Sequence, residues 1–221
     1  MEETNSTQKL LNAAQWPVSM IIIMWVSKLL EIFGGLHFSN WGVWPRHIEG
    51  LWGIWASPFI HGSMGHLINN SVPFFVSGLI IFYFYRKIAL PTLAIIWTLT
   101  GLLVWIFGKP AFHIGASGVV YGMVSFIFWA GIFNRDRKSI VLSLIILFLY
   151  SGMFYGVLPN QPGVSWESHL LGGIVGILVA YLFKNREEDS DEWDEDEESD
   201  YFFEPDTFTT TKQERYWNNR T

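Results

Sequence analysis

The sequence predicts an all-α protein that crosses a membrane several times and ends in a disordered acidic tail. Hydrophobic residues make up 50% of the chain and charged residues 15%, whereas soluble domains contain roughly 25% charged residues. Six apolar runs approach the roughly 20 residues that a membrane-spanning helix needs. Residues 187–221, by contrast, hold 14 Asp and Glu against 3 Lys and Arg. We therefore expect a bundle of six transmembrane helices and no soluble domain.

The six apolar runs cover approximately 16–34, 66–85, 90–107, 117–133, 139–157 and 168–183. The second and the sixth begin with polar residues that hydropathy alone would penalise. Residues 1–15 are polar, with acidic Glu2 and Glu3, and the run that follows is long enough to span a membrane rather than to be cleaved as a signal peptide. We expect the first helix to be retained.

The positive charges of the loops predict the orientation of these spans, because short loops that carry Lys and Arg tend to remain cytoplasmic. With a cytoplasmic N-terminus, the inner segments hold eight Lys and Arg and the outer loops hold two, Arg46 and Lys109. Both termini are then cytoplasmic, and spans two, four and six begin at the outer surface. The predicted domains are a cytoplasmic segment at 1–15, a membrane domain at 16–185 and a tail at 186–221, which has too few aliphatic residues to fold.

The outer loop from about 35 to 60 is long and rich in tryptophan. It holds Trp41, Trp44, Trp52 and Trp55, and tryptophan favours the membrane interface because its ring is apolar while its N–H can be hydrated. We expect this loop to lie in the outer leaflet surface. The chain has no cysteine, which excludes disulfides, thiolate metal sites and cysteine nucleophiles.

Polar residues inside a membrane span are costly and therefore point to function. The first such cluster runs from His61 to Asn70, HGSMGHLINN. In it, His66 and Asn70 are four residues apart and share one helix face. Their side chains bring donors together, although either residue alone also fits a hydrogen bond between helices.

The second cluster runs from Gly115 to Gly122, GASGVVYG. Gly115 and Gly118 permit tight turning and close backbone approach, and Gly118 and Gly122 form a stripe of small residues. Tyr121 lies one turn below Ser117 on the same helix face. Taken alone, a serine beside glycine in a membrane helix also fits plain packing.

The third cluster, HLLGGIVG, starts at His169. Gly172 and Gly176 form a second stripe of small residues, which lets a neighbouring helix approach closely. If that neighbour is the helix that begins at Ser117, with its own glycine stripe, Ser117 and His169 come within hydrogen-bond reach, roughly 3 Å.

Together the clusters predict a Ser–His dyad. A histidine, with an ordinary pKa of about 6.5, can take the serine proton near neutral pH and return it to the leaving group. The backbone N–H of Ser117 and the side chains of His66 and Asn70 are suitable donors for a developing oxyanion. Glu167 lies two residues before His169, and this spacing directs it to a different helix face, so we expect no acidic third member.

A metal site is the main competing interpretation of the histidines, and their spacing argues against it. His61 and His66 are five residues apart and lack the HExxH arrangement, and His113 would complete a three-histidine set only by chance. A small-solute transporter lacks support, because the polar residues gather at the outer ends of the helices. We expect no metal, no cofactor and no nucleic-acid partner.

With these motifs in this order, the chain resembles the rhomboid intramembrane serine proteases over roughly residues 10–185. The HxxxxHxxxN pattern from His61 to Asn70, the GxSG motif around Ser117 and the HxxGxxxG pattern from His169 fall on the second, fourth and sixth spans. GxSG alone is a weak signal, whereas the ordered set is highly specific.

The resemblance implies a rhomboid-like six-helix bundle with a water-filled cavity that opens outward. In this bundle Ser117 would be the nucleophile and His169 the general base. His66, Asn70 and the backbone N–H of Ser117 would bind the oxyanion.

The same resemblance implies that Tyr121 packs beside the general base and that His61 has a supporting, mainly structural role. Helix five, at about 139–157, would be a lateral gate, and the loop at about 158–167 a cap. The substrate in the bilayer would be a single-pass membrane protein whose helix unwinds locally, because a peptide bond inside a hydrogen-bonded helix is not open to attack.

One departure from the family pattern lies in the first outer loop, where many members carry Trp-Arg. This chain has Trp52-Gly53 instead. The motif is regarded as structural, so the departure puts the folding of the loop in question rather than the chemistry.

The compact six-span core and the lack of a transit peptide favour a bacterial plasma membrane as the location. The alternative to a protease is a non-catalytic rhomboid-like protein that binds or escorts transmembrane helices in the same cavity.

Overall fold

The computed structural model describes residues 6–159, 165–184 and 186. In these residues the chain forms α-helices, short 3-10 helices and no β-strand, apart from one isolated antiparallel bridge between Val43 and His113. The acidic tail predicted beyond residue 186 lies outside the described residues, as do residues 160–164 of the predicted cap.

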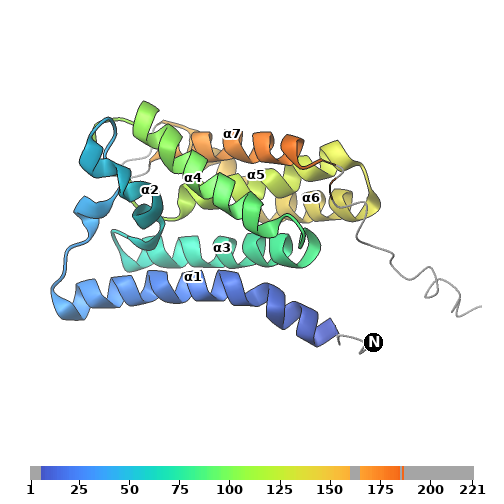
Figure 1. Ribbon diagram of the computed structural model, residues 1–221, viewed down its shortest axis with the longest axis horizontal. Coiled ribbons are helices and arrows are strands. Elements are labelled where there is room, and N and C mark those ends of the chain that lie inside the picture. The colour runs from blue at the N-terminus through green and yellow to red at the C-terminus, as the bar shows by residue number, and fades with distance from the viewer. Residues whose placement is uncertain (1–5, 160–164, 185, 187–221) are drawn as a thin grey trace, which may run out of the picture. The chain divides into compact units, whose positions relative to one another are not determined.

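Six long helices form the body of the protein (Figure 1). They are α1 (Ser6–Gly34), α3 (Met64–Phe84), α4 (Ala89–Phe107), α5 (Ser117–Asn134), α6 (Arg137–Tyr150) and α7 (Trp166–Leu182). The short elements are η1 (Ser39–Trp41), η2 (Ile48–Leu51), α2 (Gly53–Ala56), η3 (Ser57–Phe59) and η4 (Ser151–Val157).

Four of these helices, α1, α3, α4 and α5, are long and apolar enough to cross a membrane. α7 is apolar but has only 17 residues, and α6 has 14 residues and continues directly into η4. The predicted all-α membrane class is therefore confirmed, with four helices that meet the length of a span among the described residues.

Two helix boundaries differ from the sequence prediction. α1 begins at Ser6 rather than at about residue 16, because its first turns contain polar and small residues of high helix propensity that a hydropathy criterion ignores. α6 ends at Tyr150, and residues 151–157 form η4. Gly152 and Gly156 lie in this segment, and glycine destabilises the interior of an α-helix.

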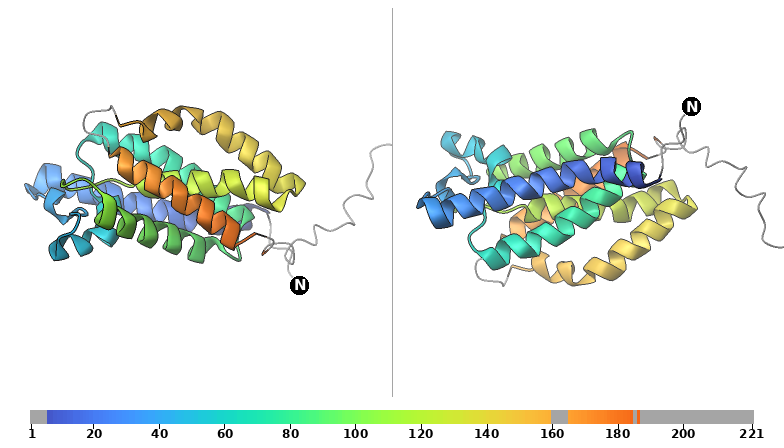
Figure 2. Two further views of the ribbon diagram at one scale, coloured as in Figure 1. Left: turned by 90° about the horizontal axis from the view of Figure 1, so that it is seen from above. Right: turned by 90° about the horizontal axis from the view of Figure 1, so that it is seen from below.

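α5 lies at the centre of the helical unit, in contact with α3, α4, α6 and α7. Half of its most apolar 18-residue window is buried, compared with 11% for α1. α4 and α6 lie on opposite edges with α5 between them (Figure 2), and α1 packs against α3. The serine predicted as a nucleophile is thus the first residue of the most buried long helix.

Glycines allow α5 and α7 to approach closely. A side chain at Gly172 would overlap the carbonyl group of Gly118, and one at Gly176 would overlap the carbonyl group of Gly122. Gly122 also lies against Ile96 of α4. This close approach brings the N-terminal ends of α5 and α7 side by side.

The loop predicted to lie on the outer side is folded, and contacts other than a Trp-Arg motif hold it. Arg46 donates hydrogen bonds from Nη1 to the carbonyl oxygens of Ile106 (3.2 Å) and Gly108 (2.8 Å) at the end of α4. At the position of the missing arginine, Gly53 lies against the backbone of Gly42, where any side chain would collide. The departure from the family pattern therefore does not leave the loop unstructured.

Candidate functional site

Ser117 and His169 meet where α5 and α7 begin. The Oγ atom of Ser117 lies 2.8 Å from Nε2 of His169. His169 is buried and Ser117 is partly exposed. The two residues are 52 positions apart in the chain, and the glycine contacts between α5 and α7 bring them together.

The second ring nitrogen of His169 identifies the tautomer. Nδ1 lies 2.8 Å from the carbonyl oxygen of Gly156 in η4, and a carbonyl oxygen can only accept a hydrogen bond. In the neutral ring the proton is therefore on Nδ1, and Nε2 carries a lone pair directed at the Ser117 hydroxyl. This arrangement lets Ser117 donate its proton to His169.

Tyr121 fixes the face of the His169 ring. The two rings are stacked at a centroid distance of 4.1 Å and an interplanar angle of 8°. The Tyr121 hydroxyl donates a hydrogen bond of 2.6 Å to the carbonyl oxygen of Met153 in η4. η4 therefore contacts both rings, one through Gly156 and the other through Met153.

The side chains of His66 and Asn70 lie against Gly115, which is two residues before Ser117 in the chain. A Cβ atom added to Gly115 would be 2.6 Å from Nε2 of His66 and 3.5 Å from Nδ2 of Asn70. Gly115 has φ of +102°, a conformation that glycine adopts readily. The Asn70 amide donates a hydrogen bond of 3.1 Å to the His66 carbonyl oxygen. Only glycine at this position leaves room for both side chains.

The backbone N–H of Ser117 lies at the N-terminus of α5, where the first four N–H groups of a helix lack intrahelical partners. The preceding residue, Ala116, provides no side-chain cap. The positive end of the helix dipole favours negative charge at this point. The Ser117 N–H is thus suited to hold an anion beside the serine oxygen.

The ring of His61 packs against the ring of His66. His61 is 1% exposed, and its ring meets that of His66 edge-on at 5.0 Å. Burial, followed by the neighbouring His66 and Lys28, lowers the pKa of His61 to about 4. His61 is consequently neutral at physiological pH.

Lys28 and Glu31 of α1 contribute to the same region, and the sequence analysis did not identify them. Their side chains are each 12% exposed and form an ion pair of 2.9 Å. Lys28 also donates to the carbonyl oxygen of His61 (2.9 Å), and Glu31 accepts from the backbone N–H of Phe38 (3.1 Å). A charged pair inside an apolar run was the signal that could have revealed them.

Two residues that the sequence analysis set aside lie next to the dyad and interact elsewhere. Glu167 pairs with Lys109 at 3.7 Å, and His113 is hydrogen-bonded to Ser165. The second partner of His169 is the backbone carbonyl of Gly156 rather than a carboxylate.

A pocket opens beside Ser117, between α4 and the segment that leads into α5. Its lining combines small or polar residues, such as Thr100, Gly118 and Ser168, with larger apolar ones, such as Ile54 and Trp97. The free volume of the pocket is only about 30 Å³, so the space next to the serine accepts a small group more readily than a large one.

Comparisons with known proteins point to one family. A family model described as the Rhomboid domain matches residues 48–186. Uncharacterised proteins of Mycobacterium bovis and Mycobacterium tuberculosis are 33% identical over 174 residues, which cover 75% of this chain and 72% of each relative. An uncharacterised protein of Mycobacterium leprae is 29% identical over 189 residues, 81% of this chain and 75% of the relative.

Proposed function

This chain belongs to the rhomboid family, and from that premise we propose that it is an intramembrane serine endopeptidase with Ser117 as nucleophile and His169 as general base. The observation that carries the proposal is the contact of 2.8 Å between Ser117 Oγ and His169 Nε2, in a histidine whose other nitrogen faces a carbonyl oxygen. A serine in a purely packing role needs no such partner.

The reaction begins when Ser117 Oγ attacks the carbonyl carbon of the scissile peptide bond. Its proton passes to Nε2 of His169, and the carbonyl oxygen becomes an oxyanion. His169 then gives this proton to the leaving amine as the C–N bond breaks, which leaves an acyl group on Ser117. A water molecule, deprotonated by the same nitrogen, releases the acyl group and restores the serine.

The oxyanion is held by the backbone N–H of Ser117 and the side chains of His66 and Asn70. Donors placed where charge develops contribute most to acyl transfer, and removing one costs roughly 100- to 1,000-fold in kcat. The position of His66 and Asn70 over Gly115 supports this assignment, as does the free helix terminus at Ser117.

We propose that six segments span the membrane, with α6 and η4 acting as one span and α7 as another. The 14 residues of α6 rise about 21 Å at 1.5 Å each, and the seven residues of η4 add about 14 Å, enough for a hydrocarbon core of roughly 30 Å. Both termini then face the cytoplasm and the dyad lies near the outer surface. The mycobacterial relatives support a bacterial plasma membrane.

The substrates would be transmembrane proteins with small or helix-weakening residues near the cleavage site. The small volume of the pocket beside Ser117, about 30 Å³, supports the preference for small residues. Substrate helices would enter past α6, which contacts α5 but has few contacts with the other long helices.

The test is a cleavage assay on a transmembrane reporter in proteoliposomes, together with labelling by a fluorophosphonate. Wild-type protein should cleave the reporter and be labelled, and Ser117→Ala should lose both while keeping its thermal midpoint. Cleavage that persists in Ser117→Ala would sink the proposal. A wild-type protein that binds the reporter helix but is neither labelled nor active would favour the alternative, a protein that binds or escorts transmembrane helices.

A further inference from the structure

His113 is a buried histidine that lines the pocket beside Ser117, and the proposed reaction gives its ring no chemical role. It lies four residues before Ser117 and is 5% exposed. Its backbone is paired in both directions with Val43: Val43 N–H donates to the His113 carbonyl (3.0 Å), and His113 N–H donates to the Val43 carbonyl (2.9 Å). The backbone at His113 is therefore fixed to the outer loop, and its ring projects from a rigid point.

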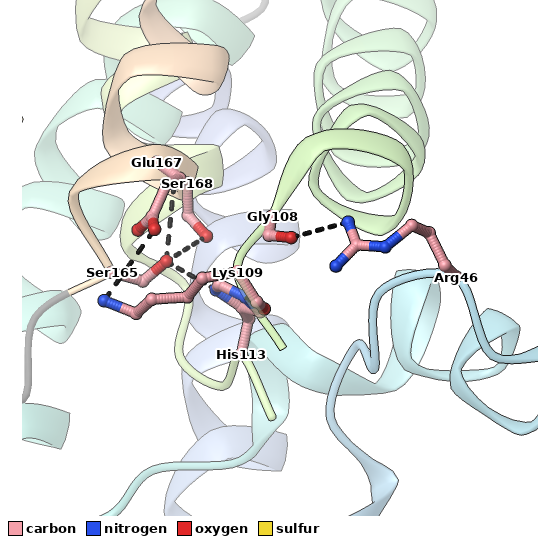
Figure 3. Close-up of polar contacts among 7 residues, drawn as sticks. All are labelled: Arg46, Gly108, Lys109, His113, Ser165, Glu167 and Ser168. Carbon is pink, nitrogen blue, oxygen red and sulfur yellow. Dashed lines mark hydrogen bonds and ion pairs between the residues drawn. The ribbon is translucent and has the colours of Figure 1, made fainter. Parts of the chain in front are cut away.

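Both nitrogens of the His113 ring have partners (Figure 3). Nε2 lies 3.1 Å from the carbonyl oxygen of Lys109, which can only accept, so Nε2 carries the proton. Burial lowers the pKa of His113, which favours the neutral ring. Nδ1 then accepts a hydrogen bond from the hydroxyl of Ser165 at 2.6 Å.

The hydrogen bonds continue from Ser165 into α7. Because the Ser165 hydroxyl donates its proton to His113, the Ser165 oxygen accepts a hydrogen bond from the Ser168 hydroxyl at 2.7 Å. The same oxygen accepts from the backbone N–H of Ser168 at 3.4 Å and so caps the helix. Ser168 directly precedes His169. A chain of hydrogen bonds thus connects His113, in the segment before Ser117, with Ser168, the residue before His169.

The ion pair between Lys109 and Glu167 spans the same junction at 3.7 Å. The Glu167 side chain is 12% exposed but that of Lys109 is 52% exposed, and at 3.7 Å the pair is too long for a hydrogen bond, so solvent at Lys109 weakens it. The His113 ring, in contrast, is buried, and removing one partner of its hydrogen bond would leave a buried polar group unsatisfied. The His113 ring is therefore the stronger of the two side-chain connections.

We propose that His113 is a positioning residue that sets the register between the nucleophile and the general base by tying the first turn of α7 to the segment leading into α5. This role rests on the proposed serine protease function. The glycine contacts at Gly118 and Gly172 determine how close the two helices come. His113 determines where the first turn of α7, which carries His169, lies along α5.

Two substitutions of His113 separate its two hydrogen bonds. His113→Gln places an amide N–H near the position of Nε2 and keeps the bond to Lys109, but loses the acceptor for Ser165. His113→Asn places an amide oxygen near the position of Nδ1 and keeps the acceptor for Ser165. Both replacements are neutral and polar. Ser125→Ala is the matched control, because it removes a different hydrogen bond between α5 and α7, from Ser125 Oγ to the Gly173 carbonyl (2.7 Å).

The experiment measures kcat, KM, fluorophosphonate labelling rate and thermal midpoint for the full chain in proteoliposomes. We expect His113→Gln to lower kcat and the labelling rate by roughly 10- to 100-fold, the effect of misplacing reacting groups by up to about 1 Å, with KM unchanged. His113→Asn and Ser125→Ala should keep kcat and the labelling rate within about threefold of wild type, because the hydrogen bond between residue 113 and Ser165 survives in both. If His113→Gln does not fold, Ser165→Ala and Ser165→Thr test the same bond from its other end, and only the threonine should preserve the rate.

A labelling rate of wild-type size in His113→Gln, or an equal loss in Ser125→Ala, would overturn the positioning role while leaving the protease intact. If wild-type protein shows no labelling that depends on Ser117, the proposed function fails and the positioning role fails with it.

Discussion

Gly156→Ala should separate the orientation of His169 from the stability of the fold. A methyl group at position 156 would lie 3.0 Å from His169 Nδ1 and closer still to the Tyr121 hydroxyl, whereas ordinary contact starts at 3.4 Å. The His169 ring must then move by several tenths of an ångström, and the Tyr121 hydroxyl must move further and give up its bond to Met153. The lost bond costs about 1 kcal/mol, and the displaced ring should lower kcat by roughly 10- to 100-fold.

The control is Gly152→Ala in the same 3-10 segment, where an added methyl group meets no atom within 4 Å. Neither glycine has a positive φ, so both alanines are compatible with the backbone. Fluorophosphonate labelling of both variants, with thermal midpoints measured alongside, provides the comparison. Adding Tyr121→Phe to Gly156→Ala removes the closest contact and should recover part of the rate. Labelling of Gly156→Ala at the wild-type rate would refute the orienting role of η4.

Three further predictions concern pH, charge and packing. Because the pKa of His61 is about 4 in the folded protein and ordinarily 6.5, stability should fall as the pH decreases from about 6.5 to about 4, by about 3 kcal/mol at 1.4 kcal/mol per unit. His61→Gln should flatten the dependence of the thermal midpoint on pH, and an unchanged slope would contradict this. Lys28→Met should cost about 1–3 kcal/mol by leaving the part-buried Glu31 with only its hydrogen bond to Phe38, and the double variant with Glu31→Leu should recover most of it in thermal denaturation. Gly172→Ala should cost about 1–3 kcal/mol by overpacking α7 against α5, whereas Gly173→Ala, with nothing within 4 Å, should leave the melting curve unchanged or slightly improved.

The sequence was sufficient to predict the helical membrane class and the family, because both depend on patterns of side chains. Apolar runs identified the helices, and the spacing within the His61, Ser117 and His169 clusters pointed to one family. The ends of the helices were harder to predict from the sequence. The polar first turns of α1 are helical for reasons of propensity, and η4 departs from α-helical geometry at Gly152 and Gly156, inside a run that hydropathy alone marks as continuous.

The parts of the site that the sequence did not reveal are those in which backbone groups act. The carbonyl of Gly156 orients His169, and any residue can provide a carbonyl, so no residue type marks the position. Lys28 and Glu31 escaped for a different reason. Averaging hydropathy over a 29-residue helix hides one buried ion pair, whose partner is the main chain at His61.

The use of a carbonyl in place of an acid follows from the location of the dyad. A carboxylate hydrogen-bonded to the buried His169 would have to remain ionised away from water, and desolvating a charge is costly. The Gly156 carbonyl holds the same tautomer without any charge to desolvate, and stacking on Tyr121 fixes the plane of the ring. A neutral carbonyl stabilises the imidazolium formed during the reaction less than a carboxylate does. The proposed dyad therefore depends more heavily on geometry, which is why Gly156 and His113 are expected to control its rate.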